Sequence, residues 1–236
     1  MTTVARLDNV QHATLRLRRG HGARFGEAVN QVAVFASEFA QVQREYPILF
    51  ARAPDGALQA VAILGFDRDE NLFLDGERWD AAYVPALLRR RPFTIGAGDG
   101  EPAAYVDLAD PRVAADGEDG EPVFKTHGGN APALEAALEA LRALQAGAAM
   151  APGMTALFDE LGLVEAVRLQ VQFDEHTGVD FDGYLAVVPE KIAALDDGAL
   201  GRLNRAGLLD VALFAAASLG TMPRLVARKQ RKLAAG

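Results

Sequence analysis

The chain has 236 residues, of which 50% are hydrophobic and 24% are charged. This composition is typical of a folded globular protein and excludes an intrinsically disordered chain. The formal net charge of -8 excludes an overall basic surface for nucleic acid. Because cysteine is absent, disulfides, thiolate metal sites, iron–sulfur clusters and cysteine nucleophiles are also excluded.

The ends of the chain give no sign of export. The first twenty residues lack the continuous apolar segment of a secretion signal. The longest apolar stretch, Gly207–Gly220, is interrupted by Asp210 and is shorter than the roughly 20 residues that cross a bilayer. The sequence therefore predicts a soluble, cytoplasmic protein without a membrane span.

Short strands are predicted for the N-terminal half. Residues 13–19 alternate apolar and polar side chains, the period of a half-buried strand. Residues 31–46 begin with β-branched residues and change to helical spacing, and the helix is expected to end before Pro47. The turn sequence Pro-Asp-Gly at 54–56 separates two apolar runs and predicts a β-hairpin. A further short strand is predicted at 71–74.

The only tryptophan and three consecutive arginines lie in one segment that predicts a short helix. Pro85 suits the first helical turn, where its missing N–H costs nothing. Arg89–Arg91 would then lie at the helix C-terminus, where the macrodipole favours positive charge. Trp79, Tyr83 and Leu87 recur at helical spacing and predict one buried apolar face. The arginine end of the segment is expected to be exposed, because unpaired guanidinium groups are costly to bury.

The second half is predicted to be mainly helical. Residues 96–120 are rich in glycine and acidic residues and favour loops around one strand. A long amphipathic helix is expected after Asn130, its N-cap, with Pro132 as an early helical residue and a stripe of four leucines: Leu134, Leu138, Leu141 and Leu144. A separate helix at 154–164, two alternating strands and a helical C-terminus follow.

This mixture of strand and helix blocks predicts an α+β fold with a mixed, mostly antiparallel sheet, N-terminal strands and a helical C-terminal half. We expect a single domain over residues 1–236, with a possible subdivision near 126–130. Residues 224–236 are rich in lysine and arginine and are interpreted as a basic tail.

Several stretches are similar to one known family. The chain reads YPILF at 46–50 and ENLFLDGERWDAAYVPALLRRRPF at 70–93. These stretches resemble the signature of the bacterial SapC family, in which a Y-P-[IV]-[VL]-F strand precedes G-x-N-L-F, R-W-D, Y-V-P and an arginine-proline-phenylalanine end. GEPVF at 120–124 and the closing region 181–225 are similar too. Where relatives commonly carry a histidine near the end, this chain has Ala216, so a role for that histidine does not carry over.

The resemblance, which covers roughly residues 12–225, implies an accessory role rather than a defined reaction. The family name refers to association with a bacterial surface layer, and some members are labelled peptide-transport permeases. Such genes often neighbour TonB-dependent receptors, flavin-dependent halogenase-like proteins and cupin-type proteins. The permease label conflicts with the absence of a predicted membrane span, and the family supplies no catalytic residues to carry over.

Residue patterns for common chemistries are weak. GAGDG at 96–100 lacks the third glycine of a dinucleotide fingerprint and precedes a strand rather than a helix. The acidic stretch around His176 permits a carboxylate–imidazole metal site but is equally well explained as a hairpin tip. The two serines, Ser37 and Ser218, lie outside any nucleophile elbow. We therefore predict no metal and no cofactor.

Anion recognition is the chemistry that the residues favour most. Arg78, Arg89, Arg90 and Arg91 carry planar donors for carboxylate or phosphate, and Trp79 or Tyr83 would supply an aromatic floor. Since consecutive helical residues point in different directions, at most two of the three adjacent arginines converge. The alternative is that this segment is structural, with Trp79 packed in the core.

A second anion-binding candidate is His127. It precedes two glycines and a helix start, which would bring its imidazole and backbone N–H groups to one anion, although a surface loop histidine is the simpler interpretation.

These observations predict a soluble accessory or binding protein whose partner is a protein or a small anionic ligand, without nucleic acid. Such a protein would be connected with surface-layer or receptor- and halogenase-type gene systems. The alternative is an enzyme that modifies a small molecule or peptide in a pocket near His127 and the arginines. The oligomeric state is left open.

Overall fold

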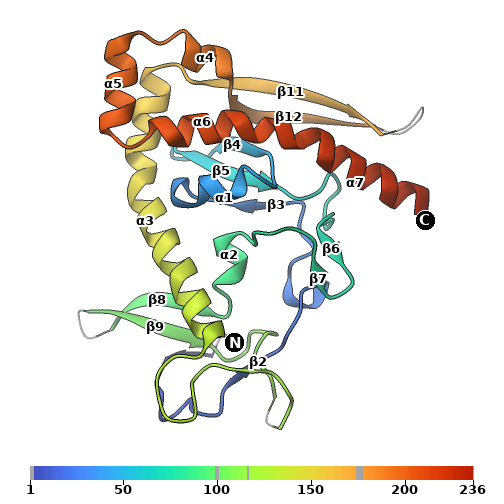
Figure 1. Cartoon of the computed structure of the whole chain (residues 1–236), viewed down its shortest axis with the longest axis vertical. Helices are drawn as coiled ribbons and strands as arrows, with labels where there is room; N and C mark the ends of the chain where they lie inside the picture. Colours follow the sequence, from blue (N-terminus) through green and yellow to red (C-terminus); the bar gives the residue numbers. More distant parts are fainter. Residues whose placement is uncertain (1–2, 99–100, 116, 174–177, 236) are drawn as a thin grey trace. The chain divides into compact units, whose positions relative to one another are not determined.

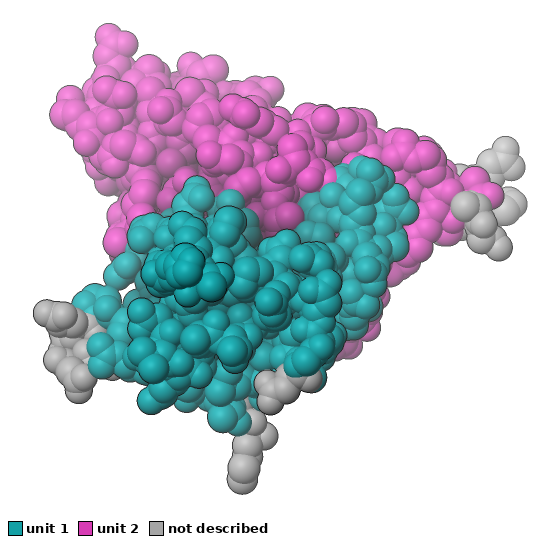
Figure 2. All heavy atoms as spheres, turned by 60° about the horizontal axis from the view of Figure 1, so that its bottom comes forward, with its two compact units in different colours: residues 1–27, 74–80, 86–145 teal, residues 28–73, 81–85, 146–236 magenta. Residues whose placement is uncertain are grey.

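The computed structural model describes residues 3–98, 101–115, 117–173 and 178–235. The chain forms two compact units, which Figure 2 shows in different colours. Unit 1 comprises Met1–Glu27, Leu74–Asp80 and Ala86–Gln145, and unit 2 comprises Ala28–Phe73, Ala81–Pro85 and Ala146–Gly236. Both contain antiparallel sheet and helix, so the predicted α+β class is confirmed.

Unit 1 is built on small antiparallel sheets. The largest has the strand order β1-β9-β8 and is formed by Val4–Arg6, Glu101–Asp107 and Phe93–Gly98. Two further strand pairs are β2 with β10 (Arg16–Leu17 and Glu121–Pro122) and β6 with β7 (Leu74–Asp75 and Arg78–Trp79). A 3₁₀ turn η1 (Ala23–Phe25) and the short helix α2 (Ala86–Arg89) complete this part of the unit.

The core of unit 1 lies between these strands and the first half of helix α3 (Pro132–Glu160). The α3 side chains on one face pack with apolar residues from β2, β8, β9 and the β10 region. The buried cluster consists of Leu17, Phe93, Val106, Val123, Phe124, Leu134, Ala137 and Leu141. Of the leucine stripe predicted from the sequence, Leu134 and Leu141 lie in this core and Leu138 packs against it, whereas Leu144 is half-buried outside the cluster.

Unit 2 contains one five-stranded antiparallel sheet with the strand order β11-β12-β4-β5-β3. Its strands are Val164–Gln172, Gly178–Val187, Ile48–Arg52, Leu58–Ile63 and Gln31–Ala33. β4 and β5 pair from Ile48↔Ala62 to Arg52↔Leu58, so the hairpin predicted around the Pro-Asp-Gly turn is confirmed. The two alternating strands predicted after the helical segment are confirmed as β11 and β12.

The helices of unit 2 are short near its N-terminal strands and longer at its C-terminal end (Figure 1). Besides residues 146–160 of α3, they are η2 (Ala36–Glu38), α1 (Phe39–Val42), α4 (Pro189–Ala193), α5 (Asp197–Arg205), α6 (Leu209–Ser218), η3 (Leu219–Thr221) and α7 (Met222–Ala235). α6 packs against β4 and β12 and buries Val211, Ala212 and Ala215. This arrangement covers the sheet with an alanine-rich helix face.

Among the described residues, one helical stretch, Leu209–Ala234, is long and apolar enough to cross a membrane by length and composition alone. The stretch includes the α6 residues that pack on the sheet and extends into the basic helix α7. The core helix of a soluble protein meets the same criterion, so this property is weak evidence for a membrane span.

The long helix α3 corrects the prediction of two separate helices. It runs without interruption from Pro132 to Glu160 and contains Pro152 in its interior. Gly147 lies inside α3, where a side chain in its place would lie 2.3 Å from the Cβ of Phe35. The glycine therefore permits close packing of the helix rather than ending it.

The segment with the only tryptophan also differs from its prediction. Trp79 is on strand β7 and only Ala86–Arg89 are helical, so the predicted helical face that joined Trp79, Tyr83 and Leu87 is wrong. Trp79 is buried, as expected, but Leu88 rather than Leu87 is the buried leucine of α2. The turn at Asp75–Gly76, with Gly76 at φ 60°, pairs Leu74 with Trp79 and leads the chain into a hairpin.

The C-terminal basic segment forms helix α7 and is anchored by a buried ion cluster in unit 2. The Lys229 ammonium lies 2.5 Å from Asp67 Oδ2 and 2.8 Å from Glu70 Oε1, and Lys232 lies 2.9 Å from the same Glu70 oxygen. Glu70 and Lys229 are each 5% exposed. Burial alone would raise the pKa of Glu70, but the two lysines and the Phe66 and Asp67 amides outweigh it and lower that pKa to about 2.

We expect this cluster to make stability depend on acid pH. The folded-state pKa of Glu70 lies below its ordinary value of 4.5, so its contribution to stability is complete above about pH 4.5 and decreases as pH falls toward 2. Wild type should lose about 2 kcal/mol more unfolding free energy than Glu70→Gln between about pH 6 and pH 3, measured by urea denaturation. An identical loss in both proteins would contradict this role.

Replacing the buried tryptophan should destabilise the protein through a cavity. Trp79→Ala is expected to lower the free energy of unfolding by about 3–5 kcal/mol. The control is Arg78→Ala, the exposed neighbour on the same strand, which should change it by about 0–1 kcal/mol. Chemical denaturation measures both, and equal stability of Trp79→Ala and wild type would show that the tryptophan is not a packing residue.

Candidate functional site

Unit 1 contains a hollow of about 630 Å³ whose charged residues are all basic. We call it the basic hollow. Its walls are formed by Asn9, Ala13, Thr14, Leu15, Arg16, Pro122, Phe124, Lys125, Thr126, Gly128, Ala131 and Pro132. Arg16 and Lys125 are the cations, and no carboxylate is part of this lining. In a chain with net charge -8, such a site is locally suited to an anion.

Backbone geometry fixes the two sides of the basic hollow. Arg16 lies on β2, and its Nη1 donates a hydrogen bond of 2.8 Å to the Gly120 carbonyl. On the other side, the Lys125 amide donates to the Gly129 carbonyl at 2.9 Å, which closes a tight turn. Gly128 and Gly129 have φ angles of 89° and 84°, a conformation that side-chain-bearing residues rarely adopt. The double glycine therefore shapes the turn that holds Lys125.

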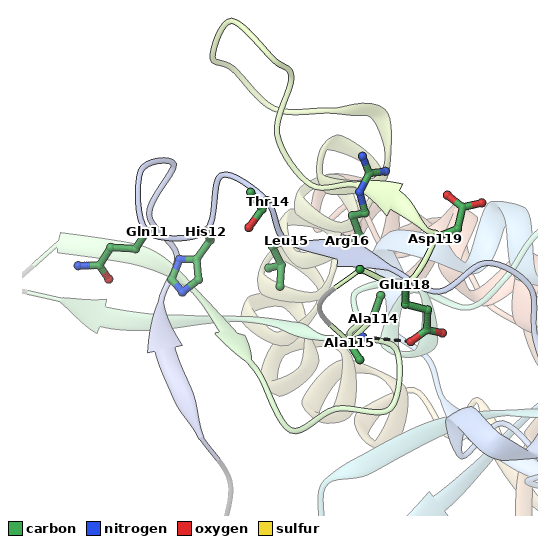
Figure 3. Close-up of a pocket in the computed structure, with 10 residues that line it drawn as sticks. Gln11, His12, Thr14, Leu15, Arg16, Ala114, Ala115, Glu118 and Asp119 are labelled. Carbon is green, nitrogen blue, oxygen red and sulfur yellow. Dashed lines mark hydrogen bonds between the residues drawn. The ribbon is translucent and has the colours of Figure 1, made fainter.

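A second hollow of about 500 Å³ shares the segment Thr14–Arg16 with the first, and we call it the mixed hollow. Its other lining residues are Gln11, His12, Ala114, Ala115, Gly117, Glu118 and Asp119. In Figure 3, Arg16 extends to one side of the strand, whereas Leu15 and His12 extend to the other. His12 is 9% exposed, and its Nδ1 lies 3.0 Å from the Asp8 amide nitrogen.

The acidic residues of the mixed hollow are already engaged. Arg18 donates two hydrogen bonds of 2.7 Å to Glu118, and the Ala115 amide donates a third. These donors, the guanidinium first, lower the pKa of Glu118 to about 2. Asp119 pairs with Arg19 at 3.1 Å. An anion in the mixed hollow would meet these two carboxylates, so the basic hollow is the better anion site.

Unit 1 contains a buried carboxylate centre at Glu27 that was not predicted from the sequence. Glu27 is 1% exposed and accepts hydrogen bonds from Arg112 and from the Gly22 amide, the latter at 2.8 Å. Its two oxygens both lie 3.2 Å from His21 Nδ1. Burial would raise the pKa of Glu27, but these partners outweigh it and lower the pKa.

The loop R-G-H-G-A-R-F-G-E (19–27) places these groups around one point. Gly20, Gly22 and Gly26 all have positive φ angles. The guanidinium carbon of Arg112 lies over the Phe25 ring, 4.4 Å from the centre of that ring. The sequence signal for this centre was a short loop in which three glycines alternate with other residues, among them His21 and Glu27. The Glu27 carboxylate orients the His21 imidazole through Nδ1. The His21 ring then lies beside Trp79, with the two ring centres 5.5 Å apart.

The structure separates the residues that the sequence grouped as an anion site. Arg78 is exposed and pairs with Asp75 at 2.9 Å. Tyr83 belongs to unit 2, where its hydroxyl donates to buried Glu38 at 2.8 Å. His127 is exposed in the turn after Lys125 but is not among the residues that line the basic hollow.

The arginine triplet is half-buried rather than exposed, which corrects the prediction for Arg89, Arg90 and Arg91. Arg90 Nη1 donates to the Phe93 carbonyl at 2.8 Å. Arg91 lies 2.9 Å from Asp110 and also donates to the Phe25 carbonyl. None of the seven predicted residues lines the basic or the mixed hollow, and their role in recognition stays a prediction.

Other predicted chemistry has a structural explanation or lies outside the described ranges. Ser218 Oγ donates to the Ala215 carbonyl and accepts a bond of 2.9 Å from the Ile48 amide, so it ties α6 to β4. Asp174–His176 lie outside the described residues. Within the part of the chain that the structure describes, no group of three or more acidic or histidine residues is arranged to hold a metal ion.

The fold and the two hollows define an α+β protein with a candidate anion-binding surface in unit 1. The SapC family model matches residues 7–225, so the chain belongs to the SapC family. This match confirms the resemblance found from the sequence. A search of curated proteins found no match, and no solved structure matches the chain.

We expect the Glu27 centre to be required for the stability of unit 1. Glu27→Gln removes the charge that Arg112 and His21 share, and breaking a buried ion pair costs about 3–5 kcal/mol. The control is Glu77→Gln, because Glu77 is exposed and pairs with exposed Arg24, a contact worth about 0–1 kcal/mol. Urea denaturation at neutral pH compares the two variants. Equal losses of unfolding free energy in Glu27→Gln and Glu77→Gln would show that Glu27 is not a structural centre.

Proposed function

We propose that this SapC-family protein binds a small anionic ligand in the basic hollow. The observation that carries the proposal is the lining itself, with two cations, no carboxylate and an apolar wall that includes Leu15 and Phe124. Ligand sites are typically concave, largely apolar and equipped with a few placed polar groups. A volume of about 630 Å³ lies within the usual range of such sites.

The charges of Arg16 and Lys125 also favour recognition of an anion. Within the described residues, neither Arg16 nor Lys125 takes part in an ion pair, whereas Arg18, Arg19 and Arg112 each pair with a carboxylate. Arg16 is held by a carbonyl, which positions the guanidinium without neutralising it. A carboxylate or phosphate therefore gains charge-assisted hydrogen bonds without displacing an internal anion.

We further propose that the protein works in the cytoplasm as an accessory protein, in line with the role implied by the family resemblance and its surface-layer or receptor-linked gene systems. The enzyme alternative near His127 has less support. His127 is exposed and lies outside the lining of the basic hollow, and the arginine triplet is engaged within unit 1.

Titration with acetate and with inorganic phosphate tests the binding function. Arg16→Gln and Lys125→Gln should each weaken binding about tenfold, because a hydrogen bond to a charged group contributes about 1.5 kcal/mol or more. Isothermal calorimetry or chemical-shift titration of the full chain measures the affinity.

The matched control is Arg142→Gln, an exposed cation of α3 that does not line the basic hollow. It should bind like wild type. Absence of saturable binding of both anions to wild type, or equal weakening by all three substitutions, would overturn the proposed function.

A further inference from the structure

An apolar groove adjoins the basic hollow within unit 1. It has a volume of about 330 Å³ and is lined by Leu7, Asp8, Asn9, Ala104, Phe124, Gly129, Asn130, Leu134 and Leu138. Asn9 and Phe124 line both the groove and the basic hollow. The two spaces therefore share part of their walls.

The apolar lining of the groove belongs to the core of unit 1. Phe124 is 9% exposed and Leu134 is 1% exposed, and both are members of the buried cluster. Leu7 and Leu138 are half-buried and pack against that cluster. Leu134 and Leu138 are four residues apart on α3, so they present neighbouring side chains on one helix face. The groove is thus a surface extension of a packed core.

One carboxylate, Asp8, is part of the groove lining, and it is already engaged by its own turn. Its Oδ1 accepts hydrogen bonds of 2.8 Å from the Val10 and Gln11 amides. Those backbone donors lower the pKa of Asp8. The one carboxylate at this end is therefore occupied locally, whereas the cations Arg16 and Lys125 line the basic hollow.

We infer that the ligand of this site is an amphipathic acid. This inference rests on the proposed function and specifies its ligand class. A carboxylate head lies between Arg16 and Lys125, and an unbranched apolar chain passes Phe124 and lies along Leu7, Leu134 and Leu138. Charge complementarity selects the head, and removal of the chain from water stabilises the complex in proportion to the apolar area covered.

A series of straight-chain carboxylates tests the inference on the full chain. Acetate, hexanoate and decanoate are titrated as monomers in solution, and their dissociation constants are compared. Complete burial of one methylene strengthens binding about fourfold. In an open groove, where burial is partial, we expect each methylene to strengthen binding about twofold. Hexanoate should therefore bind about 16-fold more tightly than acetate or better, at two-fold per methylene.

Leu138→Glu places a carboxylate in the groove and should abolish the gain with chain length while acetate binding is retained. Leu144→Glu makes the same change on the same helix outside the groove lining, and it should keep the gain. If circular dichroism shows that Leu138→Glu does not fold, Leu7→Gln on the groove wall replaces it with the same expectation.

The outcomes separate the two proposals. Equal affinities for acetate, hexanoate and decanoate would overturn the amphipathic ligand and leave the anion-binding function standing. A chain-length gain that survives Leu138→Glu and Leu7→Gln would also overturn it, because the chain would then bind elsewhere. Failure of acetate and phosphate alike to bind would overturn the proposed function itself.

Discussion

Burial of the Phe124 side chain is the constraint on which the candidate site depends. The ring is held in the unit 1 core, and the backbone on both sides of it is fixed. The Val123 amide donates to the Leu15 carbonyl, and the Ala131 amide donates to the Val123 carbonyl, both at 3.0 Å. Lys125 follows directly and α3 begins one residue after Ala131. The core contact thereby places the cation, the turn and the helix start together.

The same constraint links the two ligand-facing spaces. Phe124 lines the basic hollow and the apolar groove, and its neighbours in the core include Leu134 from α3. Because packed interiors respond to changes of even one methylene, a core residue that also lines a site makes that site rigid. A rigid site loses little conformational entropy on binding, which favours affinity for a small ligand. Under the proposed function, stability and recognition would therefore be supported by the same side chains in unit 1.

Charge is distributed so that the buried ions are paired and the basic hollow keeps its cations. Glu27 is paired with Arg112, and Glu70 is paired with Lys229 in the other unit. Each pair offsets the large cost of moving an ion out of water, and each lowers the pKa of its carboxyl group. Arg16 instead binds a carbonyl. The net charge of -8 averages over these local differences, which is why it did not indicate an anion site.

Local sequence signals predicted those parts of the fold that depend on neighbouring residues. The Pro-Asp-Gly turn predicted the β4–β5 hairpin, and the alternation of apolar and polar residues predicted β11 and β12. The predicted division of the helix before residue 154 was wrong: α3 continues, and Gly147 within it approaches Phe35, a contact over a long sequence separation. The Glu27 centre was missed for the same reason, since Arg112 is remote in the chain.

The candidate site was also missed because its residues are far apart in the sequence. Its position in the chain shows in addition what the family resemblance specifies. Arg16 and Lys125 are far apart in sequence and meet only through the fold, whereas the adjacent arginines at 89–91 attracted the prediction. The signature residues Tyr46, Phe50 and Trp79 are buried by contrast. The part of the SapC signature that these residues represent is therefore accounted for by packing. Arg16 and Leu138, the side chains to which we assign ligand contact, lie outside the central signature at 46–93. Membership of the family therefore specifies the scaffold and leaves the ligand to be identified from the surface of unit 1.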